Sequence, residues 1–204
     1  MICINCKNET THTKNDLCLD CYFKIHSPTK TIETPWIFQQ VPLRFDRIRT
    51  TGEKLFDSEI ADRIIKGQYS IDKDKNQLQI VDYSFPYTLE GLDKVALKAG
   101  ILVGKWLIYR SEETIDSVWK KVAFSVMKRR LGSSAKVSTV KQKSKSYVIC
   151  VYTDDYLVYD DVRRVREELF SLGFEESLCY KPDLYTYLNI YSGTSSIKPC
   201  RYRI

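Results

Sequence analysis

Glycine, proline and long apolar runs are scarce in this chain of 204 residues. With 8 glycines and 6 prolines, the composition excludes a collagenous chain and a Gly/Pro-rich disordered one. The glycines are also scattered, so the chain lacks a glycine-rich loop of the kind that cradles phosphates in nucleotide hydrolases. No apolar run approaches the ~20 residues of a membrane helix, and the first residues lack the features of a signal peptide. We therefore expect a cytoplasmic globular protein.

Histidine is rarer still, since it occurs only at His12 and His26. A Ser/His/Asp set and a pair of carboxylates at catalytic spacing are not recognisable either. These absences disfavour hydrolases and NTPases. The sequence favours a protein without enzymatic activity, but it leaves that question open.

The hydrophobic fraction of 43% and the charged fraction of 28% are typical of a chain with a packed core. The length fits one ordinary domain with a small appended module. We expect the module in residues 1–27, a linker of small polar residues and prolines in 28–35, and an α+β domain in 36–204.

Four cysteines form the strongest local motif of the chain. Cys3-x2-Cys6 and Cys18-x2-Cys21 are two knuckles separated by eleven residues, which is the pattern of a zinc ribbon. Four thiolates complete a tetrahedral shell, so the Zn²⁺ is expected to be structural, with a catalytic metal or a redox pair as the weaker alternative. Disulfides are rare in a reducing compartment. The remaining three cysteines, Cys150, Cys179 and Cys200, are widely spaced, and we expect Cys150, within an apolar run, to be a small core residue.

Apolar spacing predicts four helices and four extended segments in the main domain. Helices are expected over 57–67, 88–100, 115–132 and 160–173, each with an apolar residue every three or four positions and a glycine at its end. Extended segments are expected over 106–109, 137–140, 147–152 and 185–191. Trp106 and Trp119 are expected in the core.

The positive charge of the chain is concentrated in one stretch. Between residues 117 and 153 there are nine Lys or Arg and no Asp or Glu, whereas the formal net charge of the whole chain is +6. Such a stretch suits phosphate oxygens, although basic runs are more often solvated helix surface. The candidate phosphate-binding or RNA-binding residues are Lys136, Lys141, Lys143, Lys145, Arg129 and Arg130.

Aromatic residues supply candidates for stacking on a base. The chain has 3 Trp, 14 Tyr and 8 Phe, and stacking on such a ring contributes roughly 1–3 kcal/mol per base. We single out Trp36, Tyr83, Phe85 and Tyr87 as candidates, against the alternative that these rings belong to the core.

The order of these segments resembles a known fold. The run 104–108, the helix carrying Trp119, the Ser/Lys-rich hairpin, the run 148–153 and the helix ending at Gly173 resemble the carboxyl-terminal half of the cap-binding translation initiation factor. Segments 131–139, 148–153 and 180–188 are similar to a family of archaeal and eukaryotic proteins placed beside that fold and sometimes labelled phosphothreonine lyases. The resemblance covers residues 100–204.

This resemblance implies a curved antiparallel sheet backed by helices. It places Lys141, Lys143 and Lys145 where the family holds the phosphates of the cap. An aromatic residue of the 83–87 segment, or Trp36, would replace the tryptophans that sandwich methylguanine in that family.

We therefore expect a non-enzymatic protein that binds RNA or a nucleotide resembling a 5′ end. One alternative is an interaction factor that docks on a ribosome or on another protein. A second alternative is a phosphothreonine lyase, with Lys136 as the base.

Overall fold

The computed structural model describes residues 2–9, 13–14, 17–29, 34–40, 69–72, 77–80, 88–139, 146–188, 190–193 and 195–204. The strands are β1 (Thr13–Lys14), β2 (Leu17–Cys18), β3 (Trp36–Gln40), β4 (Tyr69–Asp72), β5 (Gln77–Ile80), β6 (Gly104–Arg110), β7 (Ser134–Ser138), β8 (Tyr147–Thr153), β9 (Cys179–Pro182) and β10 (Tyr202–Arg203). The helices are α1 (Leu19–Ile25), α4 (Leu89–Ala99), α5 (Glu112–Met127), α6 (Tyr159–Ser171) and α7 (Asp183–Tyr187). None of the described helices is both long enough and apolar enough to cross a membrane.

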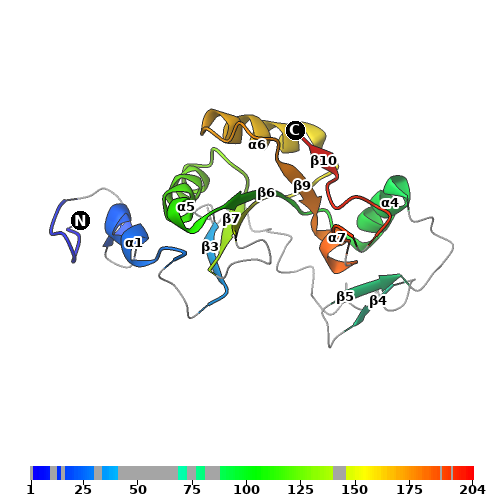
Figure 1. Ribbon diagram of the computed structural model, residues 1–204, viewed down its shortest axis with the longest axis horizontal. Helices are drawn as coiled ribbons and strands as arrows, with labels where there is room; N and C mark the ends of the chain where they lie inside the picture. Colours follow the sequence, from blue (N-terminus) through cyan, green and yellow to red (C-terminus); the bar gives the residue numbers. More distant parts are fainter. Residues whose placement is uncertain are drawn as a thin grey trace.

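A curved six-stranded sheet forms the centre of the fold (Figure 1). Its strand order is β10-β9-β6-β8-β7-β3, and all neighbours pair antiparallel. Helices α5 and α6 lie on the same side of this sheet (Figure 1). The predicted α+β class, an antiparallel sheet backed by helices, is confirmed.

Local sequence signals explain where the helices begin and end. Thr88 precedes α4, and its hydroxyl accepts a hydrogen bond from the backbone N–H of Gly91. Gly100 ends the helix in the left-handed conformation with a φ of 68°, which a residue without a Cβ adopts at little cost. Helix α6 begins at Tyr159 after Val158, not after Asp160 as a capping argument suggests. The predicted helix over 57–67 lies outside the described residues.

One face of the sheet packs on helices α5 and α6 and forms the core. Because side chains alternate along a strand and directly paired residues share a face, Trp106 lies on the same face as Val151 and Tyr180. Trp106 is fully buried and donates its indole N–H to the carbonyl of Val162 in α6, at 3.1 Å. Trp119 in α5 is also buried. The prediction that both tryptophans are core residues is confirmed.

Contrary to the prediction, Gly132 does not end the preceding helix, because α5 ends at Met127 with Lys128 as its C-cap. A Cβ atom at this position would lie 1.7 Å from the carbonyl oxygen of Tyr152. The chain therefore requires glycine here because the backbone entering β7 passes directly against β8.

The predicted extended segment over 185–191 is wrong. Residues Asp183–Tyr187 form the short helix α7, which follows directly on β9. The alternation of Tyr185 and Tyr187 suggested a strand, but burial of Leu184 and Tyr185 in the core favours one turn of helix instead. Tertiary packing here overrides a short-range pattern.

The cysteines of the main domain have two different roles. Cys150 is buried in β8, as predicted. Cys179 and Cys200 form a disulfide that joins β9 to the carboxyl-terminal segment. This pair departs from the expectation that disulfides are rare in a reducing compartment, and the cytoplasmic location stays a prediction.

Candidate functional site

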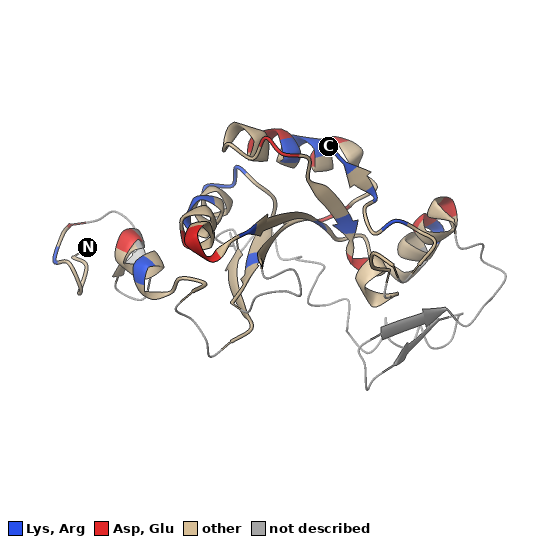
Figure 2. Ribbon diagram, in the orientation of Figure 1, with Lys and Arg blue, Asp and Glu red and all other residues tan. Residues whose placement is uncertain are grey.

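Three lysines gather on the face of the sheet opposite α5 and α6. In the strand register Lys105 of β6 is paired with Tyr152 of β8 and with Lys181 of β9, so these three side chains share that face. Lys136 of β7 is paired with Cys150 and with Phe38 of β3, one row along the same face. We call the set Lys105, Lys136, Lys181, Trp36, Phe38 and Tyr152 the lysine face. Figure 2 shows positive residues on strands of the central sheet and residues of both signs on the helices.

Lys136 lies among three aromatic rings. Its ammonium is 4.2 Å from the ring centroid of Trp36, 5.9 Å from that of Phe38 and 5.8 Å from that of Tyr152. All three distances fall within the roughly 6 Å range of a cation–π contact. Burial lowers the pKa of Lys136, and the nearby charge of Lys105 lowers it further. Phe38 is 57% exposed, which leaves this aromatic edge open to contact a ligand.

Lys105 is held by an acid of helix α7. Its ammonium forms an ion pair with Asp183 and donates a hydrogen bond to the hydroxyl of Thr186 at 3.3 Å. It also lies 5.6 Å from the ring centroid of Tyr152. The ammonium groups of Lys105 and Lys136 thus both approach the ring of Tyr152.

Lys181 is the most deeply buried of the three lysines, with 4% of its surface exposed. Its ammonium lies 3.5 Å from the ring centroid of Tyr191. Burial lowers its pKa to about 8, and the charge of Lys105 acts in the same direction. Within the part of the chain that the structure describes, neither Lys181 nor Lys136 forms an ion pair, although the charge of Asp183 favours the charged form of both.

The predicted site residues are distributed over different parts of the molecule. The structure brings Lys136 and Trp36 together on the lysine face. Arg129 and Arg130 follow the end of α5, and Arg130 is ion-paired with Glu168 of α6 at 2.7 Å, so this part of the basic stretch belongs to the helix side. The remaining candidates lie outside the described residues: Lys141, Lys143, Lys145, Tyr83, Phe85 and Tyr87.

Sequence reasoning missed Lys105, Lys181 and Tyr152. Each lies singly within an apolar strand, so a search for clustered charge passes over it. The available signal was a lysine in a strand whose remaining residues are apolar, because a buried lysine is rare unless it is paired or functional.

The four amino-terminal cysteines form a second candidate site. The sulfur atoms of Cys3, Cys6, Cys18 and Cys21 all lie within 4.8 Å of one another. Those of Cys6 and Cys18 are 3.7 Å apart, close to the ~3.8 Å edge of a tetrahedron with metal–sulfur bonds of about 2.3 Å. Backbone N–H groups of Cys6 and Cys18 lower the pKa of the Cys3 thiol to about 6. The donor set therefore fits a metal ion.

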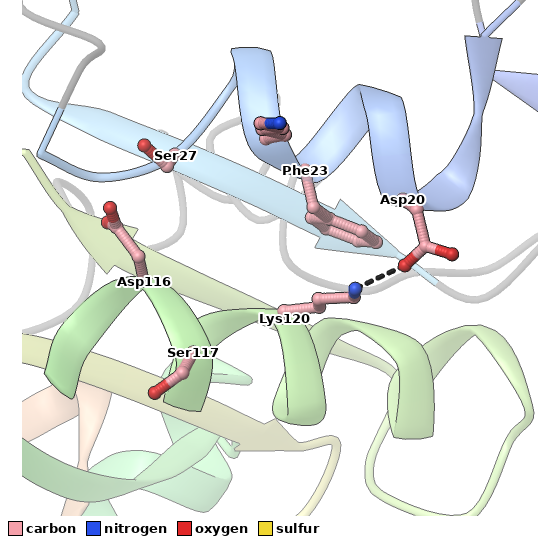
Figure 3. A pocket seen from close by; sticks show the side chains of 7 residues that line it. Asp20, Phe23, Ser27, Asp116, Ser117 and Lys120 are labelled. Atoms are coloured by element: carbon pink, nitrogen blue, oxygen red, sulfur yellow. Dashed lines mark hydrogen bonds and ion pairs between the residues drawn. The ribbon is translucent and has the colours of Figure 1, made fainter. Parts of the chain in front are cut away.

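The cysteine module contacts the main domain through α1 and α5. Phe23 of α1 belongs to the main hydrophobic core. Asp116 of α5 accepts a hydrogen bond from the backbone N–H of Thr29 at 3.0 Å and one from its hydroxyl at 2.5 Å. Lys120 of α5 forms an ion pair with Asp20 of α1, beside a hollow of about 380 Å³ (Figure 3). The module is thus packed against the helix side of the sheet.

Solved structures with a related arrangement include cap-binding factors. The structure of Ascaris suum eIF4E-3 with m2,2,7G cap is 16% identical, covers 62% of this chain and 67% of that chain, and gives a TM-score of 0.38. The complex of Schistosome eIF4E with m7GpppA and 4E-BP is 14% identical, covers 83% of this chain and 95% of that chain, and gives a TM-score of 0.40. At these identities and TM-scores the likeness says nothing about ligands.

The domain is of the α+β class, and its antiparallel sheet carries helices on one face and buried lysines on the other. The chain belongs to the family described as Basophilic leukemia-expressed protein Bles03, whose model matches residues 26–189. That match includes the whole lysine face and begins after the four cysteines.

Proposed function

We propose that the lysine face binds a nucleotide or the 5′ end of an RNA without changing it chemically. The observation that carries this proposal is the gathering of three ammonium groups and three aromatic rings on one face of the sheet, while the other face forms the core. Ammonium groups provide the charge that phosphate oxygens need. The exposed ring of Phe38 and the half-buried ring of Trp36 provide a stacking surface for a base.

The energetics of the face support an anionic ligand. Burying an ammonium group disfavours its charged form, and the lowered pKa values of Lys136 and Lys181 show this strain. Because β6 and β8 lie between the strands of Lys136 and Lys181, each ammonium needs a phosphate of its own, and a phosphate beside either one would compensate its charge. A ligand that carries phosphate would therefore stabilise the charged form of these lysines, whereas a neutral ligand would not.

Titration with GTP tests the proposal. Lys136→Gln and Lys181→Gln should each weaken binding at least tenfold, because each removes a charge from the phosphate site. Lys128→Gln is the matched control, since Lys128 also contacts a ring, that of Phe124 at 4.5 Å, but lies at the end of α5. Binding should also weaken steeply as salt rises. Equal affinities for all three variants would contradict the proposal, and a flat salt response would favour docking on a protein.

We also propose that the four cysteines hold a structural Zn²⁺. Tetrahedral sulfur coordination with no open position suits zinc better than the harder divalent ions. The metal would stabilise α1 and the contacts of the module with α5, where Phe23 and Asp20 meet the main domain. Metal analysis of the purified protein should give one zinc per chain, and any other stoichiometric metal would contradict this assignment.

The lowered pKa of Lys181 favours a second candidate function, a phosphothreonine lyase. A neutral amine at pH 8 is able to act as a base. It would take the α-proton of phosphothreonine, the C–H electron pair would form the Cα=Cβ double bond, and the Cβ–O bond would break to release phosphate. Incubation with a phosphothreonine peptide, followed by mass spectrometry, distinguishes this function from simple binding by the loss of phosphoric acid.

A further inference from the structure

We propose that the lysine face selects nucleotides with an uncharged base and rejects a base that carries a positive charge. This inference rests on the proposed function, because it concerns the ligand of the same site. It follows from the position of the Lys136 ammonium on the stacking surface. It distinguishes two nucleotides that carry the same phosphates but differ in the charge of the base.

The rings that would stack on a base already hold a cation of the protein itself. The Lys136 ammonium is surrounded by Trp36, Phe38 and Tyr152 at the distances given above. Three rings around one ammonium form a cage of the kind that binds alkylated cations. Here the cage is filled from inside by a residue of the neighbouring strand β7.

A cationic base would meet repulsion at this cage. Two unit charges of the same sign about 4 Å apart repel each other, and the repulsion grows as water is excluded. An alkylated base that stacks on Trp36 must lie beside the Lys136 ammonium or displace it from three rings. A neutral base beside the Lys136 ammonium meets no such repulsion, so it stacks without driving the ammonium from the rings.

The acid of the site compensates the three lysines only in part: the charge of Asp183 raises the pKa of Lys136 and of Lys181, but less than burial lowers it. Among the described residues, Asp183 is the carboxylate that ion-pairs with the lysine face, and it is bound to Lys105. The site described here therefore carries an excess of positive charge. That excess favours the phosphates and disfavours a positive ring.

GTP and 7-methyl-GTP are the probes, because they share the triphosphate and differ in the methyl group and the charge it brings. The wild-type protein should bind GTP at least tenfold more tightly than 7-methyl-GTP. Lys136→Met keeps the apolar stem and empties the cage, so the ratio of the two affinities should fall close to one. Lys128→Met, the control at the end of α5, should leave the ratio unchanged.

The outcomes separate the two proposals. Wild-type protein that binds 7-methyl-GTP as tightly as GTP, or more tightly, overturns the selectivity and leaves nucleotide binding in place. A Lys136→Met variant with the wild-type ratio overturns the role of the cage. Failure of both nucleotides to bind the wild-type protein overturns the proposed function together with this inference. The wild-type comparison needs no variant, so it decides the matter even if Lys136→Met does not fold.

Discussion

Replacing Lys181 by Met tests whether the lysine face is maintained at a cost to stability. The side chain is 4% exposed, and burial lowers its pKa from 10.5 to about 8. Since one pKa unit corresponds to about 1.4 kcal/mol, the difference of about 2.5 between the two values sets an upper limit of roughly 3 kcal/mol on the cost. Methionine has a similar length and retains a contact with the ring of Tyr191. We expect Lys181→Met to be more stable than wild type at pH 7 by roughly 1–3 kcal/mol.

The pH dependence of this difference follows from proton binding. Below pH 8 both the folded and the unfolded chain hold the Lys181 proton, so the full cost is present. Between pH 8 and 10.5 the unfolded chain holds more protons than the folded chain at this residue, so its contribution to stability rises with pH. The advantage of Lys181→Met should therefore shrink across that window. Urea unfolding of both proteins between pH 7 and 10 measures it.

Two results would refute this reasoning. Lys181→Met could be less stable than wild type at pH 7, which would mean that the ammonium stabilises the fold. Alternatively, the difference could be independent of pH, which would mean that the lysine titrates normally. Lys128→Met should show no gain in stability at pH 7, because Lys128 is exposed at the end of α5.

Three further predictions concern the framework around the site. Removal of metal by a chelator should lower the melting temperature, because α1 shares the main core through Phe23, and an unchanged melting temperature would show that the cysteines hold no stabilising metal. Cys179→Ser should destabilise the protein by about 3 kcal/mol, the chain-entropy contribution of a loop of about 20 residues, and equal urea midpoints for variant and wild type would contradict this. Gly132→Ala should destabilise the protein by more than 2 kcal/mol in chemical unfolding, because its methyl group collides with a backbone oxygen of β8; a loss below 0.5 kcal/mol would speak against that close approach.

Local signals predicted three helices of the main domain but not the short helix α7. Helices α4, α5 and α6 each carry an apolar stripe that is visible within one segment, and a glycine ends α4 as predicted, whereas α5 ends before Gly132. The strands were located where apolar runs are long, as in β6 and β8. The order of the strands could not be predicted from the sequence, because pairing brings together segments such as β3 and β7 that are far apart in the chain.

Only part of the candidate site could be predicted, again because the sequence does not show which strands pair. The four cysteines are a local motif, and the structure brings their sulfur atoms together. The basic stretch is continuous in the sequence, but its residues divide between the two sides of the sheet: Arg130 pairs with α6, whereas Lys136 lies on the opposite face. Lys105 and Lys181 join Lys136 only through the strand register. Charge counted along the chain therefore does not measure charge gathered on a surface.

Lysine footprinting with and without GTP tests most directly where the ligand binds. Acylation rates of individual lysines, read by mass spectrometry, should fall at Lys136 and Lys181 when GTP is added, and stay unchanged at Lys128 on the helix side. Unchanged rates at all three lysines, or protection confined to Lys128, would contradict the assignment of the binding site to the lysine face.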